Sequence, residues 1–419
     1  MPFPSTDTIN SANAEVLSHI AEADPYLVDI IPAGEIVSDL GTYELLHAGP
    51  PLRGWNEART VGALRGSILG SILHLGWAES LADAEKLMTS GKITLRSAND
   101  SGGGGTYAGV ISRTTPVLVT ENRAANIRAF AAINEGRGKA LRYGANDSET
   151  LKRLAWIEGE LADVLGLAIR RSGGINLGDI LSQALHMGDD GHSRQKAASS
   201  LILNALAPHI TASASSKDSS ERVLSFMAAN DIFFLPLTIG VAKSTMAAAT
   251  GVANSTVVTC MAANGIQFGI KISSFPDKWF TTPVPSVTGK YFEGYDLSDA
   301  NPVIGDSEIS ETMGLGAFAM AAAPALAAYV GGTPEEATRL AVEMYDITLT
   351  EHTRFKIPQL NYRGTPTGID VLKVVAQELT PLFNTGIAHK EPGVGQIGAG
   401  FVRTPLSCFR AALEAFNED

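Results

Sequence analysis

A glycine-rich stretch near the end of the sequence carries residue types that suit an anion-binding site. Residues 384–400 read NTGIAHKEPGVGQIGAG, with a His-Lys-Glu triplet directly before the glycines. Glycines let several main-chain N–H groups point into one concavity, and a helix expected from about Thr404 would present its positive end nearby. A flexible turn with an exposed Lys-Glu pair is the alternative. The residues predicted to bind phosphate or another small anion are Asn384, His389, Lys390, Gly393, Gly395, Gln396 and Gly398.

The same glycines match the G-x-G-x-x-G pattern of dinucleotide-binding proteins. That pattern needs a strand before it, a helix and a second strand after it, and an acidic residue roughly 20 residues later. Because the sequence runs only to Asp419, these elements are not expected here. We therefore predict no dinucleotide site and no other cofactor.

A second group of polar residues lies in the segment HMGDDGHSRQK, residues 186–196. The pattern predicts a junction between two helices, with Asp189, His192 and Arg194 clustered there. A carboxylate beside a histidine fixes its tautomer and raises its basicity, and an arginine offers a planar fork to a carboxylate or phosphate. His192 is thus a candidate for proton transfer with Asp189 as its partner, and Arg194 for anion binding. The alternative is a solvated turn whose aspartates cap a helix.

The segment LLHAGPPLRGW, residues 45–55, places His47 at the end of an apolar strand and Arg53 across a rigid turn. Functional residues are common at strand ends and on the loops that follow. His47 is therefore a candidate catalytic residue and Arg53 a candidate substrate ligand. A structural hydrogen bond from the histidine is the alternative.

Several acids and an amide precede an alanine-rich stretch in ANPVIGDSEISET, residues 300–312. Helix capping is the default interpretation, because carboxylates in a first turn are stabilised by the helix dipole. Asn301, Asp306 and Glu311 are kept as further candidates for the site. We predict no metal site, since no metal-ligand spacing is present.

The elements that must hold these residues indicate an α+β fold rather than a doubly wound sheet, because strands and helices do not alternate strictly. Residues 1–147 mix strand and helix patterns, residues 148–251 are almost entirely helical, and residues 252–419 return to strands, helices and the glycine-rich loop. We therefore expect mixed N- and C-terminal regions around a helical middle lobe. The polar stretch 211–220 is the predicted linker, and the uncharged run 312–332 is predicted to be one buried helix.

Composition limits the class of protein. The sequence has 419 residues, 45% of them apolar, and a formal net charge of −12. An acidic protein is a poor partner for nucleic acid or an anionic membrane, whose phosphates require basic surfaces. Cys260 and Cys408 form neither a disulfide framework nor a zinc motif, and the N-terminus lacks the pattern of a signal peptide. We expect a cytoplasmic protein with a small-molecule substrate, compatible with a homo-oligomer.

The motifs LLHAGPPLR, HMGDDGHSR, ANPVIGDSEISET and NTGIAHKEPGVGQIGAGFVRTPLSCF together resemble the YlbE/YahG-like family of bacterial proteins, also known as domain of unknown function 1116. The resemblance covers essentially the whole chain. One member of that family is a subunit of oxamate carbamoyltransferase, which acts in allantoin and purine catabolism beside an FdrA-type subunit and a further small subunit. It converts oxalurate and phosphate to oxamate and carbamoyl phosphate.

The resemblance implies a carbamoyltransferase subunit with the same kinds of partner, a ureido or amide substrate, and phosphate or carbamoyl phosphate as second ligand. The polar clusters described above would bind the anions and move the proton. The oxamate-type pattern has a His pair near the position of Asn99 and Asp100, so a paralogue that acts on a different ureido substrate is also compatible with the motifs. A stand-alone amide or ureido hydrolase would fit the same residues, as would a non-catalytic scaffold subunit.

Overall fold

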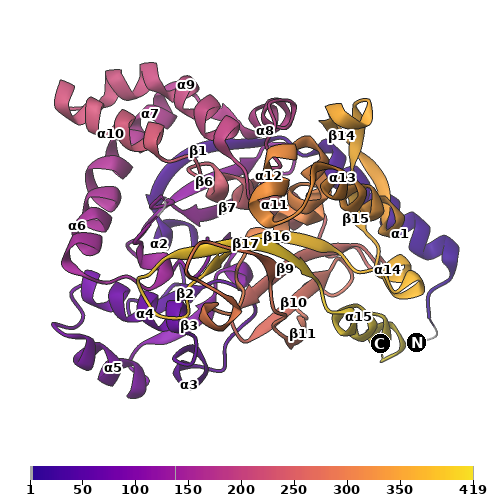
Figure 1. Ribbon diagram of the computed structural model, residues 1–419, viewed down its shortest axis with the longest axis horizontal. Helices are drawn as coiled ribbons and strands as arrows, with labels where there is room; N and C mark the ends of the chain where they lie inside the picture. The colour runs from indigo at the N-terminus through magenta and orange to yellow at the C-terminus, as the bar shows by residue number, and fades with distance from the viewer. Residues whose placement is uncertain (1–2, 137, 419) are drawn as a thin grey trace.

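The first and the last helix of the chain lie at the same edge of the molecule. In the computed structural model, which describes residues 3–136 and 138–418, helix α1 (Thr6–Glu22) and helix α15 (Leu406–Glu418) occupy the same edge (Figure 1). The rings of Phe3 and Phe416 pack with centroids 5.7 Å apart. The N- and C-terminal regions of the sequence therefore meet in space.

Two sheets form the N-terminal region. The larger has the order β4-β7-β6-β1-β8, and its β1 pairs antiparallel with both β6 and β8. The smaller has the order β3-β2-β5, with β2 parallel to β3. Their strands are β1 (Pro25–Pro32), β4 (Gly103–Gly104), β6 (Pro116–Asn122), β7 (Ile127–Ala132), β8 (Ile175–Asn176), β2 (Glu44–His47), β3 (Thr94–Ser97) and β5 (Ile111–Ser112). The short helices α2 (Ala33–Ile36) and α3 (Trp55–Ala58) and the helices α4 (Gly62–His74) and α5 (Leu81–Thr89) complete this region.

The middle of the chain is mainly helical, as expected. Its helices are α6 (Ser148–Trp156), α7 (Ala162–Ser172), α8 (Leu177–His186), α9 (Lys196–Ser213), α10 (Lys217–Ala229) and α11 (Leu235–Ala248). The predicted linker at 211–220 is wrong, because α9 continues to Ser213 and α10 begins at Lys217. The Ser216 side chain caps α10 by accepting a hydrogen bond from the Ser219 amide, so these small polar residues end and begin helices.

Three further sheets form the C-terminal region, with the orders β11-β10-β9-β13, β12-β17-β16 and β14-β15. The glycine-rich stretch 384–400 lies in the hairpin of β16 and β17, which crosses the middle of the molecule in yellow (Figure 1). The strands are β9 (Val258–Asn264), β10 (Gln267–Ile272), β11 (Phe280–Pro283), β12 (Thr288–Tyr291), β13 (Ile304–Gly305), β14 (Thr348–Ile357), β15 (Arg363–Ile369), β16 (Leu382–Ala388) and β17 (Gln396–Arg403). The helices are α12 (Pro324–Val330), α13 (Pro334–Glu343) and α14 (Val371–Gln377).

The uncharged run at 312–332 is largely buried but is not one helix. It contains the end of the 3₁₀ helix η5 (Ser307–Met313), then the 3₁₀ helix η6 (Gly316–Ala322), and finally α12. Gly314 and Gly316 have φ angles of 77° and 63°, a left-handed conformation that favours glycine and interrupts the helix. The apolar composition therefore predicted burial correctly and the continuous helix wrongly.

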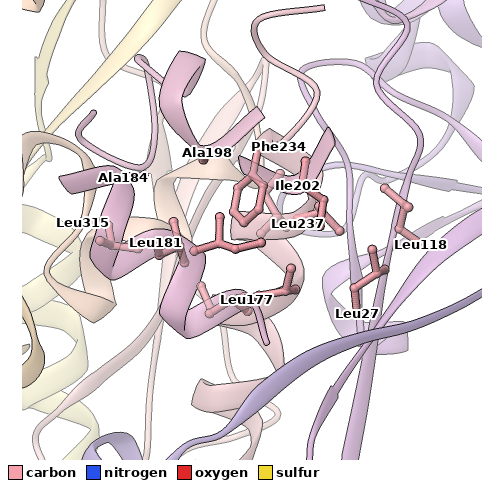
Figure 2. Packing of buried hydrophobic residues seen from close by; sticks show 14 of the residues in the cluster. Leu27, Leu118, Leu177, Leu181, Ala184, Ala198, Ile202, Phe234, Leu237 and Leu315 are labelled. Atoms are coloured by element: carbon pink, nitrogen blue, oxygen red, sulfur yellow. The ribbon is translucent and has the colours of Figure 1, made fainter. Parts of the chain in front are cut away.

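One hydrophobic cluster joins all three parts of the sequence. It contains Leu27 and Leu118 from the first predicted region, Leu181 and Leu237 from the second, and Leu315 from the third (Figure 2). The structure confirms the α+β class. The boundaries at 147 and 251 remain predictions. No helix in the described part of the chain combines the length and hydropathy needed to cross a bilayer.

Candidate active site

A small cavity lies between the loop before α9, the strand β16 and the 3₁₀ turn η2 (Leu141–Tyr143). Its volume is about 70 Å³, which is room for a few water molecules or a small metabolite. A more open cavity of about 260 Å³ shares Ser193 and Tyr329 with it. The polar side chains that line the inner cavity include Thr106, Arg142, His192, Ser193, Tyr329 and Gln396.

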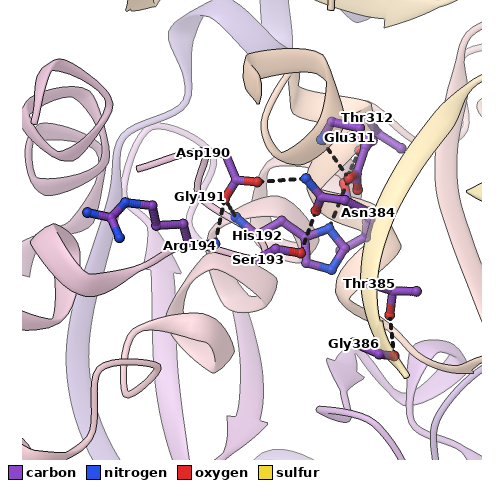
Figure 3. A network of polar contacts seen from close by, with 12 residues as sticks. Asp190, Gly191, His192, Ser193, Arg194, Glu311, Thr312, Asn384, Thr385 and Gly386 are labelled. Atoms are coloured by element: carbon purple, nitrogen blue, oxygen red, sulfur yellow. Dashed lines mark hydrogen bonds and ion pairs between the residues drawn. The ribbon is translucent and has the colours of Figure 1, made fainter. Parts of the chain in front are cut away.

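His192 and Glu311 form a buried pair at this cavity (Figure 3). The His192 Nδ1 lies 2.9 Å from Glu311 Oε1, and only 4% of His192 is exposed. Glu311 Oε1 also accepts the Ala317 amide at 3.1 Å, which fixes the carboxylate. The other ring nitrogen, Nε2, has no hydrogen-bond partner among the described residues, so it is the nitrogen available to a ligand.

The environment of His192 favours its protonated form. Burial is the largest single effect and lowers the pKa of this imidazole, but the charge and hydrogen bond of Glu311, together with the charges of Glu308 and Asp190, raise it to about 9. A histidine held by a carboxylate through Nδ1 presents its Nε2 as a hydrogen-bond donor when protonated. At neutral pH the pair therefore offers a proton rather than a lone pair to the cavity.

Asp190 ties the loop before α9 to the β16 strand. Its Oδ1 accepts the amides of His192 at 2.9 Å and Arg194 at 2.8 Å. Its Oδ2 accepts the side-chain amide of Asn384 at 2.7 Å, and Asn384 Oδ1 accepts the Ser193 hydroxyl at 2.7 Å (Figure 3). Such a buried network with complete partners holds its members in one arrangement. The position of His192 is therefore set from two sides.

The structure brings some of the predicted residues together, but the carboxylate that contacts His192 is not the predicted one. His192, Asn384 and Gln396 meet at or beside the cavity, and Glu311 takes the role that the sequence suggested for Asp189. Asp189 is fully buried and its Oδ2 accepts the Ala198 amide at 2.9 Å, so it caps α9. Burial raises the pKa of Asp189 to about 7.

Arg194 lies at the outer cavity, not the inner one. It lines the cavity of about 260 Å³ together with Lys196 and Asp231. Its Nε donates to the Gly188 carbonyl at 2.8 Å and lies 3.7 Å from Asp189 Oδ1. The hydrogen bond to Gly188 thus fixes the Nε of a guanidinium that belongs to the lining of the outer cavity.

Asp306 and Asn301 hold neighbouring segments in place. Asp306 accepts the Gly49 amide at 2.7 Å and the Gly105 amide at 2.6 Å, and it also accepts the side-chain amide of Asn99. Asn301 accepts the Ala63 amide at 3.3 Å. Burial raises the pKa of Asp306 to about 7. These contacts give both residues a structural role.

His47 and Arg53 lie apart from the cavity. His47 is fully buried, and its Nδ1 lies 2.8 Å from the Ala48 carbonyl oxygen. Burial lowers the pKa of His47 to about 4, so it is neutral at physiological pH. Arg53 has 84% of its side chain exposed and pairs with Glu57 at 3.0 Å. The structure favours the structural alternative for His47 and removes Arg53 from the cavity.

The amides of the glycine-rich hairpin are largely engaged within the protein. The His389 amide donates to the Gly395 carbonyl oxygen at 2.9 Å, and the Lys390 amide donates to the main-chain carbonyl oxygen of Asp299 at 2.7 Å. The Gly393 amide donates to Tyr143 at 3.0 Å. The Lys390 ammonium donates to the Ser298 carbonyl at 2.7 Å, and Gly398 lies inside β17, paired with β12 and β16. The donors of His389, Lys390, Gly393 and Gly398 on which the anion-binding prediction depended are thus already engaged within the protein.

Arg142 was not singled out in the sequence, and Glu308 was noted there only as one of the acids in the segment 300–312. Arg142 lines the cavity with only 4% exposed. Glu308 is fully buried, and neither of its oxygens has a hydrogen-bond partner in another described residue. Burial raises the pKa of Glu308 to about 7, against the lowering effect of His192. The sequence offered one weak signal for Arg142, a charged residue between apolar ones in the short segment ALRYG.

Comparisons with known proteins agree over nearly the whole chain. The family model described as "Oxamate carbamoyltransferase subunit AllG" matches residues 93–307. The AllG protein of Escherichia coli K12 is 40% identical, covering 98% of both chains. "Uncharacterized protein YahG" from the same organism is 39% identical, covering 99% of this chain and 87% of that protein.

A solved structure gives the same result. The crystal structure of a conserved protein of unknown function from Enterococcus faecalis V583 superposes with a TM-score of 0.95 at 40% identity and covers 98% of each chain. Identity at this level over the full length establishes common descent and a common fold. The chain therefore belongs to the family of the oxamate carbamoyltransferase subunit AllG, which confirms the YlbE/YahG-like resemblance noted in the sequence.

Proposed function

We propose that this protein is a subunit of an oxamate-type carbamoyltransferase that converts oxalurate and phosphate to oxamate and carbamoyl phosphate. The observation that carries the proposal is the 40% identity to AllG over 98% of both chains. The word subunit in that protein's name supports a complex here too, and we propose an FdrA-type chain and a further small chain as the partners.

The proposed reaction sets the requirements on the site. An oxygen of hydrogen phosphate forms a bond to the carbamoyl carbon of oxalurate, and the bond from that carbon to the oxamate nitrogen breaks. The leaving nitrogen takes up one proton, and hydrogen phosphate gives up one, so charge and atoms balance. An amide nitrogen is a poor leaving group without a proton, so a general acid is needed at this atom.

His192 meets this requirement in the proposed mechanism. Its pKa of about 9 keeps it protonated at neutral pH, and its Nε2 is the nitrogen free to reach a ligand in the cavity. It donates a proton to the departing nitrogen and regains one from the attacking phosphate. Glu311 stabilises the imidazolium and fixes the ring. The outer cavity, where Arg194 and Lys196 supply positive charge, is the proposed approach of phosphate.

The test is a reconstituted complex of this chain with its two proposed partners, assayed for carbamoyl phosphate formed from oxalurate and phosphate. The wild-type complex is expected to turn over, and His192→Gln to reduce kcat by roughly 10²–10⁴-fold, the usual contribution of a general acid. His186→Gln is the matched control, because His186 is exposed on α8 and lies outside the cavity.

A hydrolase or a scaffold subunit would give different results. No carbamoyl phosphate from the wild-type complex would contradict the proposed reaction, and turnover by the isolated chain without phosphate would indicate a hydrolase. Full activity of the His192→Gln complex would indicate a scaffold role for this chain.

A further inference from the structure

Arg142 occupies an unusual position for an arginine. It lies in the 3₁₀ turn η2, is 4% exposed, and lines the same cavity as His192. It also lines a second small cavity, of about 50 Å³, that lies on the side of α4 and α6. Its guanidinium therefore stands between two internal spaces rather than in solvent.

The charge of Arg142 is incompletely compensated. Its Nη2 donates to the Gly136 carbonyl at 2.6 Å, but its Nε has no hydrogen-bond partner in the part of the chain that the structure describes. No ion pair joins it to an acid within the described ranges, and its guanidinium carbon lies 4.5 Å from the centre of the Tyr143 ring. A buried guanidinium normally has a carboxylate or phosphate partner, because desolvating an unpaired charge is costly. The contact with the aromatic ring offsets only part of that cost.

The turn that carries Arg142 is held rigidly by its neighbouring acid. Glu135 is buried, and its two oxygens accept the amides of Leu141 at 2.9 Å and Arg142 at 3.1 Å. This carboxylate thus fixes the main chain of η2. A side chain on a fixed turn needs little reorganisation to bind a ligand.

We propose that Arg142 binds the carboxylate of the substrate and thereby selects small ureido acids over neutral ureides. The inference rests on the proposed function, in which oxalurate carries one carboxylate beyond the nitrogen that leaves. The planar guanidinium matches a planar carboxylate through parallel hydrogen bonds. The cavity of about 70 Å³ has Arg142 and His192 in its lining, so a carboxylate held by Arg142 would lie in the same space as the proposed acid.

The test compares oxamate with oxamide, its neutral counterpart of almost the same shape, by calorimetry with the full-length chain and with the reconstituted complex. The wild type is expected to bind oxamate roughly ten- to hundredfold more tightly than oxamide, the range for a hydrogen bond to a charged group. Arg142→Gln is expected to lose this preference, and Arg142→Lys to keep part of it.

The controls separate recognition from folding. Arg65→Gln, which breaks an exposed pair with Glu85 away from the cavity, is expected to keep the preference. Thermal melting shows whether each variant is folded. If Arg142 had only a structural role, its substitution would weaken the binding of oxamate and oxamide equally and leave the ratio of their affinities unchanged. If Arg142→Gln does not fold, Arg142→Lys still tests the proposal, because it is expected to keep only part of the preference for oxamate.

The outcomes distinguish this proposal from the proposed function. A wild-type chain and complex that bind neither compound, or an Arg142→Gln protein that retains the preference for oxamate, would overturn the carboxylate site. An Arg142-dependent preference in a complex that fails to convert oxalurate would leave the site standing and reject the reaction.

Discussion

At the scale of single residues, the chemistry of His192 depends on which carboxylate it faces. The neighbouring Asp189 caps a helix, whereas Glu311, far away in the sequence, makes the 2.9 Å contact with the ring. Sequence spacing identified the histidine, because a His beside acids and an Arg at a helix junction is a recognisable pattern. The spacing could not identify the partner of His192. Asp189 accepts an amide of α9 instead, and Glu311 lies in the 3₁₀ helix η5, more than a hundred residues away in the sequence.

Glu308 provides a test of buried charge at this scale. Burial raises its pKa from 4.5 to about 7, so the folded state holds the proton more tightly than the unfolded state. The contribution of this group to stability is therefore full below pH 4.5 and is lost as the pH rises through 7. We expect Glu308→Gln to be more stable than the wild type by roughly 1–3 kcal/mol at about pH 8, and by much less at about pH 5.

Urea denaturation at the two pH values measures this difference. Glu414→Gln, on an exposed position of α15, serves as the control and is expected to change little at either pH. A stability difference for Glu308→Gln that is the same at both pH values would contradict the raised pKa.

At the scale of elements, the hairpin of β16 and β17 shows why glycine content alone misleads. The sequence indicated a loop with free amides, but the segment forms two strands whose amides pair with each other and with residues of distant segments. Those partners, such as Tyr143 and Asp299, are set by tertiary packing and have no signature near the glycines. The strand β16 still reaches the site, through Asn384.

This difference leads to a prediction about Lys390. Because its ammonium donates to the Ser298 carbonyl at the surface, Lys390→Ala is expected to leave the KM for phosphate in the reconstituted complex unchanged. A charged hydrogen bond to phosphate would instead be worth roughly 1.5–3 kcal/mol, or at least about tenfold in KM. A rise of that size on substitution would restore the anion-binding interpretation of the hairpin.

The turn between η5 and η6 holds Glu311 against His192 and can be disturbed without changing either side chain. Gly316 has a φ of 63°, and an added Cβ would overlap Glu311 Oε1 and lie 3.0 Å from His192 Cβ. We expect Gly316→Ala to lower kcat of the complex by roughly 10²-fold, the cost of displacing catalytic groups by about 1 Å.

Gly173→Ala is the matched control for that variant. Gly173 also has a positive φ, 76°, but no atom of the described residues lies within 4 Å of an added Cβ. It therefore has a similar backbone strain, roughly 1–2 kcal/mol, without displacing the pair. Equal losses of activity for the two variants would show that strain, and not the Glu311 position, is responsible.

At the scale of the whole molecule, the three sequence regions share one core. The apolar and helical patterns predicted the α+β class and the helix-rich middle, because periodicity reports which faces are buried. They could not reveal that Leu27, Leu118 and Leu315 pack into the core of the middle region (Figure 2). The three regions can be distinguished in the sequence, but the hydrophobic contacts of the core join residues from all three.

We therefore expect residues 148–251 not to fold when produced alone. Leu181 and Leu237 would lose partners from both other regions and remain exposed to water, at a cost of roughly 1.5–3 kcal/mol for each large side chain. Circular dichroism during heating measures this. A cooperative melting transition of the isolated fragment would contradict the shared core and support an independent lobe.

The most direct test of whether His192 acts as the acid of carbamoyl transfer is the dependence of kcat on pH. It is measured for the reconstituted complex with the wild-type chain and with the Glu311→Gln chain. Protonated His192 is the active form, so wild-type activity is predicted to fall only as the pH rises through about 9. Without the Glu311 charge, burial lowers the pKa of His192, and the fall is predicted at a clearly lower pH. Two profiles that decline at the same pH would contradict the assignment.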